Sequence, residues 1–126
     1  MKAKVILIIM AALTLAACDD RAQKKAHKER SLKAVYNAGR DMDEARRKAD
    51  RVGATSADHE AYRAALDRLG RRKQDAVDAG VENWKVESEA LAASVDATSE
   101  RTARTLEDAK KRDTRKQTEE EDVGLE

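Results

Sequence analysis

The sequence predicts an all-α fold: an elongated helical hairpin or coiled-coil-like assembly of two to three helices with a disordered C-terminal tail. Three observations support this. Strong helix formers make up more than half of residues 18–126, and the chain has no proline. Apolar residues recur at spacings of three and four, which places them on one helix face. After residue 18 there are 19 alanines but only 17 larger apolar side chains, which fits an elongated assembly better than a compact globule.

The first 17 residues differ in composition from the rest and indicate a secretory signal peptide. Lys2 and Lys4 give a positive start, residues 5–15 are almost wholly apolar, and Ala16 and Ala17 are small, as a cleavage region requires. The run from residue 5 to residue 18 is 14 residues long. A spanning helix needs roughly 20 residues, so the alternative of a short N-terminal membrane helix is disfavoured.

The only cysteine of the chain follows this segment directly. The residues Leu15-Ala16-Ala17-Cys18 resemble the lipobox of bacterial lipoproteins, and the resemblance covers residues 1 to about 20. It implies lipid attachment to the thiol, cleavage before the cysteine and acylation of the new N-terminus. A thiolate is a strong nucleophile, and two or more acyl chains anchor a protein stably. We therefore expect a lipoprotein anchored to a membrane and facing the periplasm, with residues 18–30 as its lipidated N-terminus and tether.

Two acidic residues, Asp19 and Asp20, follow the cysteine. An aspartate at this place resembles the enterobacterial signal for retention in the inner membrane, so the inner membrane is favoured over the outer one. The alternative is an acidic start to a solvated tether. The major murein lipoprotein also combines a lipobox with a heptad helix, but it ends in a lysine that is joined to the wall. Because Glu126 stands at that place here, we do not expect covalent wall linkage by that route.

A helical region is expected over residues 31–108, and its first helix covers about residues 21–52. The apolar residues on one face of this helix alternate at spacings of three and four, and Leu32 and Tyr36 widen the start of the face. The charged residues between them have mixed signs, which suits a solvated surface. The face is formed by Val35, Ala38, Met42, Ala45, Ala49 and Val52, and the charged set is Arg40, Asp41, Asp43, Glu44, Arg46, Arg47 and Lys48.

A short turn is expected next, because Gly53 tolerates the left-handed conformation beyond a helix end. Thr55 can cap the following helix with its hydroxyl group, and Asp58 lies in the first turn near the positive end of the helix dipole. A helical hairpin is the natural product of so short a loop.

The second helix is expected over about residues 56–108. Gly80 can end it, but the stripe continues past this glycine at spacings of four and three, which favours one long helix over a second turn. The stripe is Val77, Val81, Trp84, Ser88, Leu91, Val95, Thr98, Thr102 and Thr105. Core or helix-interface packing is the favoured role of Trp84, with a partner hot spot as the alternative. Residues 109–126 lack a periodic apolar face and are expected to form a disordered charged tail.

Almost no pattern in the chain points to chemistry. His27 and His59 fall in different predicted helices, and no spacing supplies the three or four ligands of a metal site. Catalytic triads, glycine-rich phosphate loops and paired zinc cysteines are missing from the sequence. Residues 18–126 have a net charge of about −1 with interleaved signs, which disfavours nucleic acid. We therefore expect no enzyme activity, no cofactor and no small-molecule substrate.

The sequence favours a lipid-anchored helical lipoprotein with a structural or protein-interaction role in the cell envelope. Alanine layers bury little area, so we expect marginal monomer stability, or stabilisation by self-association or by an envelope protein. The alternatives are an inhibitory or exclusion-type lipoprotein of a phage or conjugative element, and an accessory subunit of an envelope complex. The candidate interaction seam comprises Val35, Met42, Val52, Val77, Val81, Trp84, Leu91 and Val95.

Overall fold

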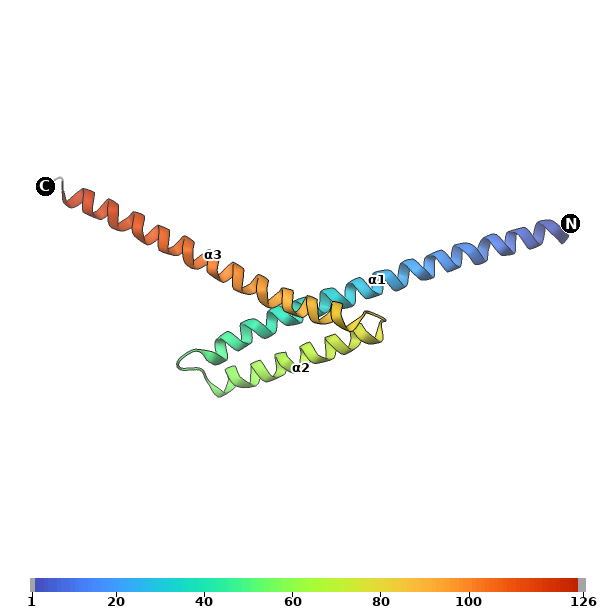
Figure 1. The fold of residues 1–126 in the computed structure, drawn as a ribbon, viewed down its shortest axis with the longest axis horizontal. Coiled ribbons are helices and arrows are strands. Elements are labelled where there is room, and N and C mark those ends of the chain that lie inside the picture. Colours follow the sequence, from blue (N-terminus) through green and yellow to red (C-terminus); the bar gives the residue numbers. More distant parts are fainter. Residues whose placement is uncertain (1, 125–126) are drawn as a thin grey trace.

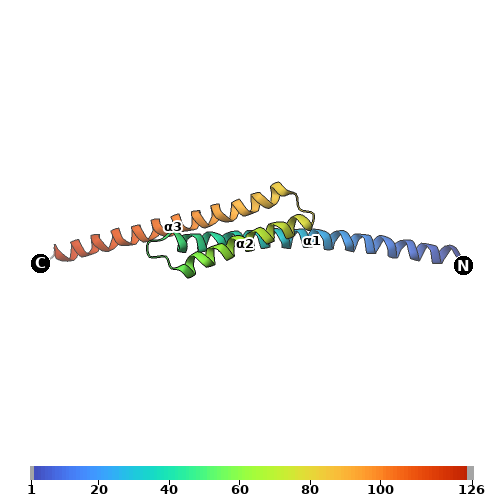
Figure 2. The same cartoon turned by 90° about the horizontal axis from the view of Figure 1, so that it is seen from below.

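The computed structural model describes residues 2–124, with side chains from residue 19 onward. It contains three helices, α1 (Lys2–Asp50), α2 (Ser56–Asp78) and α3 (Asn83–Val123), and the described residues include no strand. Helices α1 and α2 form an antiparallel hairpin, and α3 then returns across α1 at an angle (Figures 1 and 2). The predicted all-α, elongated fold is confirmed.

The first turn has the chemistry that the sequence predicts. Helix α1 ends at Asp50, and Gly53 has a positive φ of 84°. The Asp58 N–H donates to Thr55 Oγ1 at 3.2 Å, and the Thr55 N–H donates to Asp58 Oδ2 at 2.9 Å. This reciprocal capping box satisfies two backbone donors at the start of α2. The hydrogen bond from the Thr55 backbone also lowers the pKa of the Asp58 carboxyl group.

The second turn contradicts the expectation of one long helix through Gly80. This glycine has a φ of 92°, its N–H donates to Val77 O at 2.9 Å, and the Val81 N–H donates to Ala76 O at 3.0 Å. These two bonds form a Schellman motif, and the apolar contact typical of that motif joins Val81 to Ala76, both buried in the same core. An apolar residue placed after a glycine therefore closes the turn, although it also fits a continuous helical stripe.

The core is small and centred on α1. Val35 and Ala38 of α1 meet Leu69 and Ala76 of α2, together with Val81 in the second turn and Val86 of α3. Helix α1 packs against both other helices, whereas α2 and α3 make few contacts with each other. Two partners require two packing faces, so α1 buries a wider arc of its surface than a single heptad seam does.

Both ends of the molecule project from the three-helix body in opposite directions (Figure 1). Residues 18–30, expected as a tether, belong to α1, and the side chains of residues 19–30 are exposed. Residues 109–123, expected to be disordered, continue α3, and every side chain from 102 to 124 is exposed. Strong intrinsic helix formers and pairs four residues apart, such as Glu107–Lys111 at 2.8 Å, support helix in both projections. The sequence predicts no packed face in residues 109–124, and the structure has none there.

As far as the structure describes them, none of the three helices contains an apolar stretch of the length that a bilayer crossing needs.

Candidate interaction surface

The structure divides the predicted interaction seam between two faces. Four members face the interior: Val35 and Val81 are buried, and Met42 and Val77 are half-buried against the core. The other four face outward, so the eight residues do not form one surface, and the expected role of Trp84 in core or helix-interface packing is wrong. The exposed fractions of the four outward-facing residues are 105% for Val52, 63% for Trp84, 66% for Leu91 and 55% for Val95.

The inward face of α3 consists of smaller residues than the sequence led us to expect. Val86, Ala90, Ala93 and Ala97 point toward α1 and α2, and all but half-buried Ala90 are buried. Helix α1 crosses α3 closely at Gly39, where an added Cβ atom would lie 2.9 Å from the Cβ of Ala93. Only small side chains fit such a crossing. Helix α3 is therefore oriented with its alanines toward α1 and its larger residues toward the outside.

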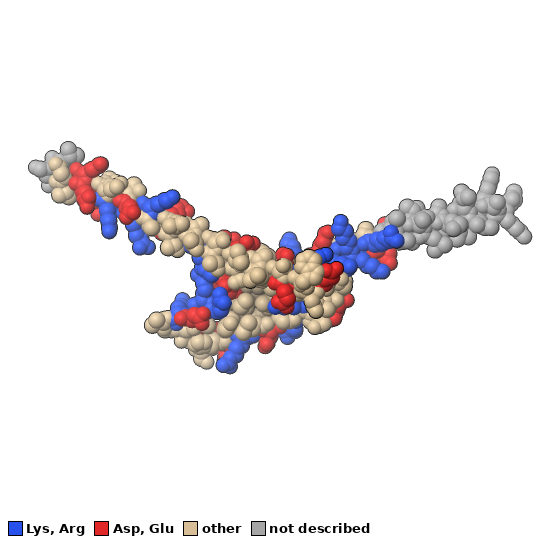
Figure 3. Space-filling model, viewed as in Figure 1, with Lys and Arg blue, Asp and Glu red and all other residues tan. Residues whose placement is uncertain are grey.

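The outward-facing side of α3 is an uncharged stripe, which we call the outer stripe. At 3.6 residues per turn its members lie within about 40° of one direction, opposite the packed face. All of them are exposed, including Leu106. Figure 3 shows mostly uncharged surface along the middle of α3, with charged groups gathered toward its C-terminal end. The outer stripe consists of Trp84, Ser88, Leu91, Val95, Thr98, Thr102, Leu106 and Ala109.

The threonine hydroxyl groups of the outer stripe donate hydrogen bonds to backbone carbonyl groups of their own helix. The Thr98 hydroxyl donates to Ser94 O and the Thr102 hydroxyl donates to Thr98 O, each at 3.0 Å. Neighbouring Thr105 donates in the same way to Arg101 O at 3.0 Å. With these donors satisfied, the threonine methyl groups remain for apolar contact. The outer stripe is therefore more apolar than its composition suggests.

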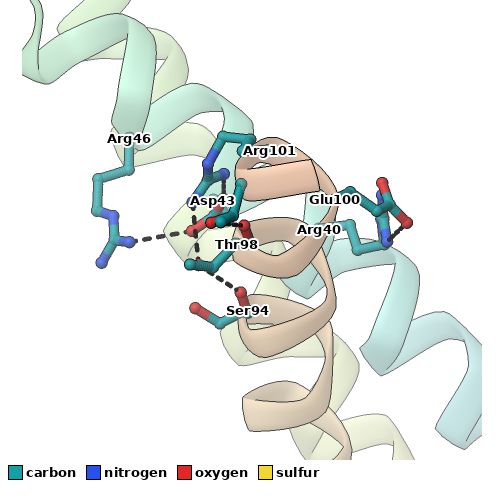
Figure 4. A network of polar contacts seen from close by, with 8 residues as sticks. Arg40, Asp43, Arg46, Ser94, Thr98, Glu100 and Arg101 are labelled. Carbon is teal, nitrogen blue, oxygen red and sulfur yellow. Dashed lines mark hydrogen bonds and ion pairs between the residues drawn. The ribbon is translucent and has the colours of Figure 1, made fainter. Parts of the chain in front are cut away.

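A carboxylate of α1 is buried where α1 and α3 meet, although the sequence pattern predicts that the charged residues of α1 lie on its solvated surface. Asp43 of α1 is fully buried, and Arg101 of α3 and Arg46 of α1 both donate to it, Arg46 at 3.0 Å (Figure 4). Arg101 also donates to Thr98 Oγ1 at 3.1 Å. Burying a carboxylate is costly unless it is paired and hydrogen-bonded. The two arginines satisfy Asp43, and Arg101 ties α3 to α1.

A second polar cluster fastens the same two helices nearer the solvent. Arg40 donates to Glu100 Oε1 at 2.9 Å and to Glu100 Oε2 at 2.5 Å, in a two-pronged ion pair. Tyr36 donates to Asp96 Oδ2 at 2.6 Å and lies beneath the Arg40 guanidinium group. The hydrogen bonds from Arg40 lower the pKa of Glu100, and the hydrogen bond to Glu100 raises the pKa of Arg40 further above its ordinary value.

Sequence periodicity missed both polar clusters because it followed one face of α1. The missed signal was a second series at spacing four, Val35, Gly39 and Asp43, in which a glycine interrupts an otherwise strong helix. Such a glycine marks the close approach of another backbone. The charged residues next to this series are then candidates for inter-helix ion pairs.

The remaining singled-out residues are not brought together. His27 of α1 and His59 of α2 are exposed, and no group of three or more metal-ligating side chains occurs among the described residues. The side chain of Cys18 lies outside the described residues. Asp19 and Asp20 are exposed on α1, and Asp20 pairs with Lys24 at 3.3 Å.

No protein-family model matches this chain, and comparisons with curated proteins and with solved structures find no match either.

Proposed function

We propose that this chain is a lipid-anchored helical protein of the cell envelope that acts by binding another protein through the outer stripe of α3. The observation that carries the proposal is the stripe itself. Trp84, Leu91 and Val95 are more than half exposed on a helix whose opposite face is already packed. Large exposed apolar side chains in a row at helical spacing are typical of helix-mediated recognition.

The lipid anchor is supported by residues 1–20 alone. A positive start, an apolar run and small residues precede Cys18 in the order that a lipobox requires. The exposed Asp19 and Asp20 follow on the surface of α1, which favours a solvated position next to a membrane. Periplasmic exposure and retention in the inner membrane form part of the proposal.

Site-specific photo-crosslinking of the full chain in its native host tests the interaction role. A photoreactive residue in place of Leu91 is expected to give a discrete crosslinked protein. A matched probe replaces Arg104, an exposed residue that faces away from the outer stripe on the same helix, and is expected to give none. Equal crosslinking from both positions, or none from Leu91, would contradict the proposal.

Processing of the N-terminus tests the anchor separately. Cys18→Ser is expected to abolish incorporation of a labelled fatty acid and to leave the signal segment uncleaved. An inhibitor of the lipoprotein signal peptidase should produce the same uncleaved chain from the wild type. The double variant Asp19→Ser/Asp20→Ser should keep the lipid but move from the inner to the outer membrane. Lipid-free wild-type protein would refute the anchor and leave the interaction role standing.

A further inference from the structure

We infer that the partner of the outer stripe is a second copy of this chain, paired with it antiparallel along α3. The inference rests on the interaction role proposed above and names its partner. Both copies use the same patch, so the pair has two-fold symmetry, the commonest arrangement of homo-oligomers.

The first support is the division of the outer stripe by size. Trp84, Leu91 and Val95 lie in the first half of the outer stripe, and Thr98, Thr102 and Ala109 lie in the second half. The second half has one larger residue, Leu106, and the residue opposite it in an antiparallel pair is Ser88. An antiparallel register places each large residue opposite a small one. In that register Trp84 faces Ala109, Leu91 faces Thr102 and Val95 faces Thr98 of the second copy. A parallel, in-register pair would instead stack Trp84 on Trp84.

The second support is the division of α3 by charge. Within the part of α3 that pairs in this register, residues 83–96 carry three acidic residues and one basic residue, whereas residues 97–110 carry three of each. Antiparallel pairing sets the acidic segment of one copy beside the neutral segment of the other. A parallel pair sets the two acidic segments together, which costs free energy. Charge and size therefore favour the same orientation.

The third support is the exposure of the projecting part of α3. Residues 102–123 form a helix with every side chain exposed, about 33 Å long at 1.5 Å per residue. A helix without tertiary packing is marginal in water. The second copy covers residues 102–109 of this segment with its larger apolar residues. Because the packed face of α3 lies opposite the outer stripe, the hairpin of each copy points away from the other copy.

Disulfide trapping between two variants tests both the partner and the orientation. The full chain is purified in mild detergent with Cys18→Ser, which removes the native thiol. Leu91→Cys and Thr102→Cys are prepared separately in this background, then mixed and oxidised. We expect a disulfide-linked dimer in the mixture that is lost when either variant is oxidised alone. Both sites are exposed, and circular dichroism confirms that the variants keep their helix content.

A control pairs Leu91→Cys with Arg104→Cys, which faces away from the outer stripe, and no dimer is expected. Dimers from either variant alone would show a parallel pair or a different antiparallel register, and either would overturn the inference. A mixture without dimer would also overturn it. If Leu91 then still crosslinks to a different protein in the host, the interaction role survives. If it crosslinks to nothing, both proposals fall.

Discussion

Gly39 and Ala93 mark the closest approach of α1 and α3, since a Cβ atom on Gly39 would lie 2.9 Å from the Cβ of Ala93. Neither atom can move away without its backbone. Gly39→Ala is therefore expected to push the helices apart and lower the free energy of unfolding by about 1–3 kcal/mol, as overpacking does. Urea denaturation followed by circular dichroism measures the change.

Gly70→Ala is the matched control for this variant, because nothing lies within 4 Å of the added Cβ atom. It should stabilise the protein by up to about 1 kcal/mol through helix propensity alone. Ala93→Gly combined with Gly39→Ala restores the space and should recover part of the loss. Stabilisation by Gly39→Ala equal to that by Gly70→Ala would show that the crossing is not tight.

Arg101→Met is expected to destabilise the protein more than Arg46→Met does. Arg101 joins two helices and its side chain is 28% exposed, whereas Arg46 pairs with Asp43 from the same helix and is 44% exposed. Loss of Arg101 leaves a buried carboxylate with one partner, which should cost about 1–3 kcal/mol. The exposed Arg46 should contribute less than about 1 kcal/mol. The denaturation midpoints of the two variants measure the difference. Equal losses of stability would refute the role of Arg101 in joining the two helices.

Trp84 and Val86 are two residues apart but differ in burial, 63% and 1% exposed. At low protein concentration, Val86→Ala should lower the free energy of unfolding by about 2 kcal/mol because it opens a cavity. Trp84→Ala should change it by no more than about 0.5 kcal/mol, as an exposed substitution does. At high concentration Trp84→Ala should weaken self-association. A large loss of monomer stability in Trp84→Ala would show that this residue packs in the core.

Acid is expected to loosen the junction of α1 and α3 through Glu100. Hydrogen bonds from Arg40 lower its pKa in the folded chain, so below the ordinary glutamate pKa of about 4.3 the unfolded chain binds more protons. The stabilisation is present above that pH and is lost as the pH falls further. Urea midpoints between pH 7 and 3 should show the gap between wild type and Glu100→Gln closing in acid.

Glu107→Gln is the control for the acid experiment, because Glu107 pairs with Lys111 of its own helix on the projecting part of α3. Its midpoints should follow the wild type at every pH. A gap for Glu100→Gln that stays constant down to pH 3 would contradict the role of its charge.

Local rules predicted the parts of the fold that depend on local chemistry. Helix propensity, the stop at Gly53 and the cap at Thr55 act within a few residues, so they can be read without tertiary information. The choice at Gly80 also had a local solution, but a stripe that continues across a turn imitates one long helix. Turn chemistry outweighed periodicity there, since Val81 closes the Schellman motif.

The candidate site was less predictable, because it depends on which face of α3 packs. Size favoured the face with Trp84, Leu91 and Val95, yet the close crossing at Gly39 accepts only the alanine face. The burial of Asp43 could not be inferred for the same reason. Its partner Arg101 lies 58 residues away, and no local pattern connects the two.

The continuity of α1 has a mechanical consequence. For a chain anchored at Cys18, residues 19–32 form a rigid helical spacer, or strut, about 20 Å long at 1.5 Å per residue, in place of a flexible tether. The strut sets the height and the rotational angle of the hairpin, and one inserted residue would turn the body by about 100°. In the antiparallel pair the two struts leave at opposite ends. An assembly of two anchored copies would therefore carry one lipid anchor at each end.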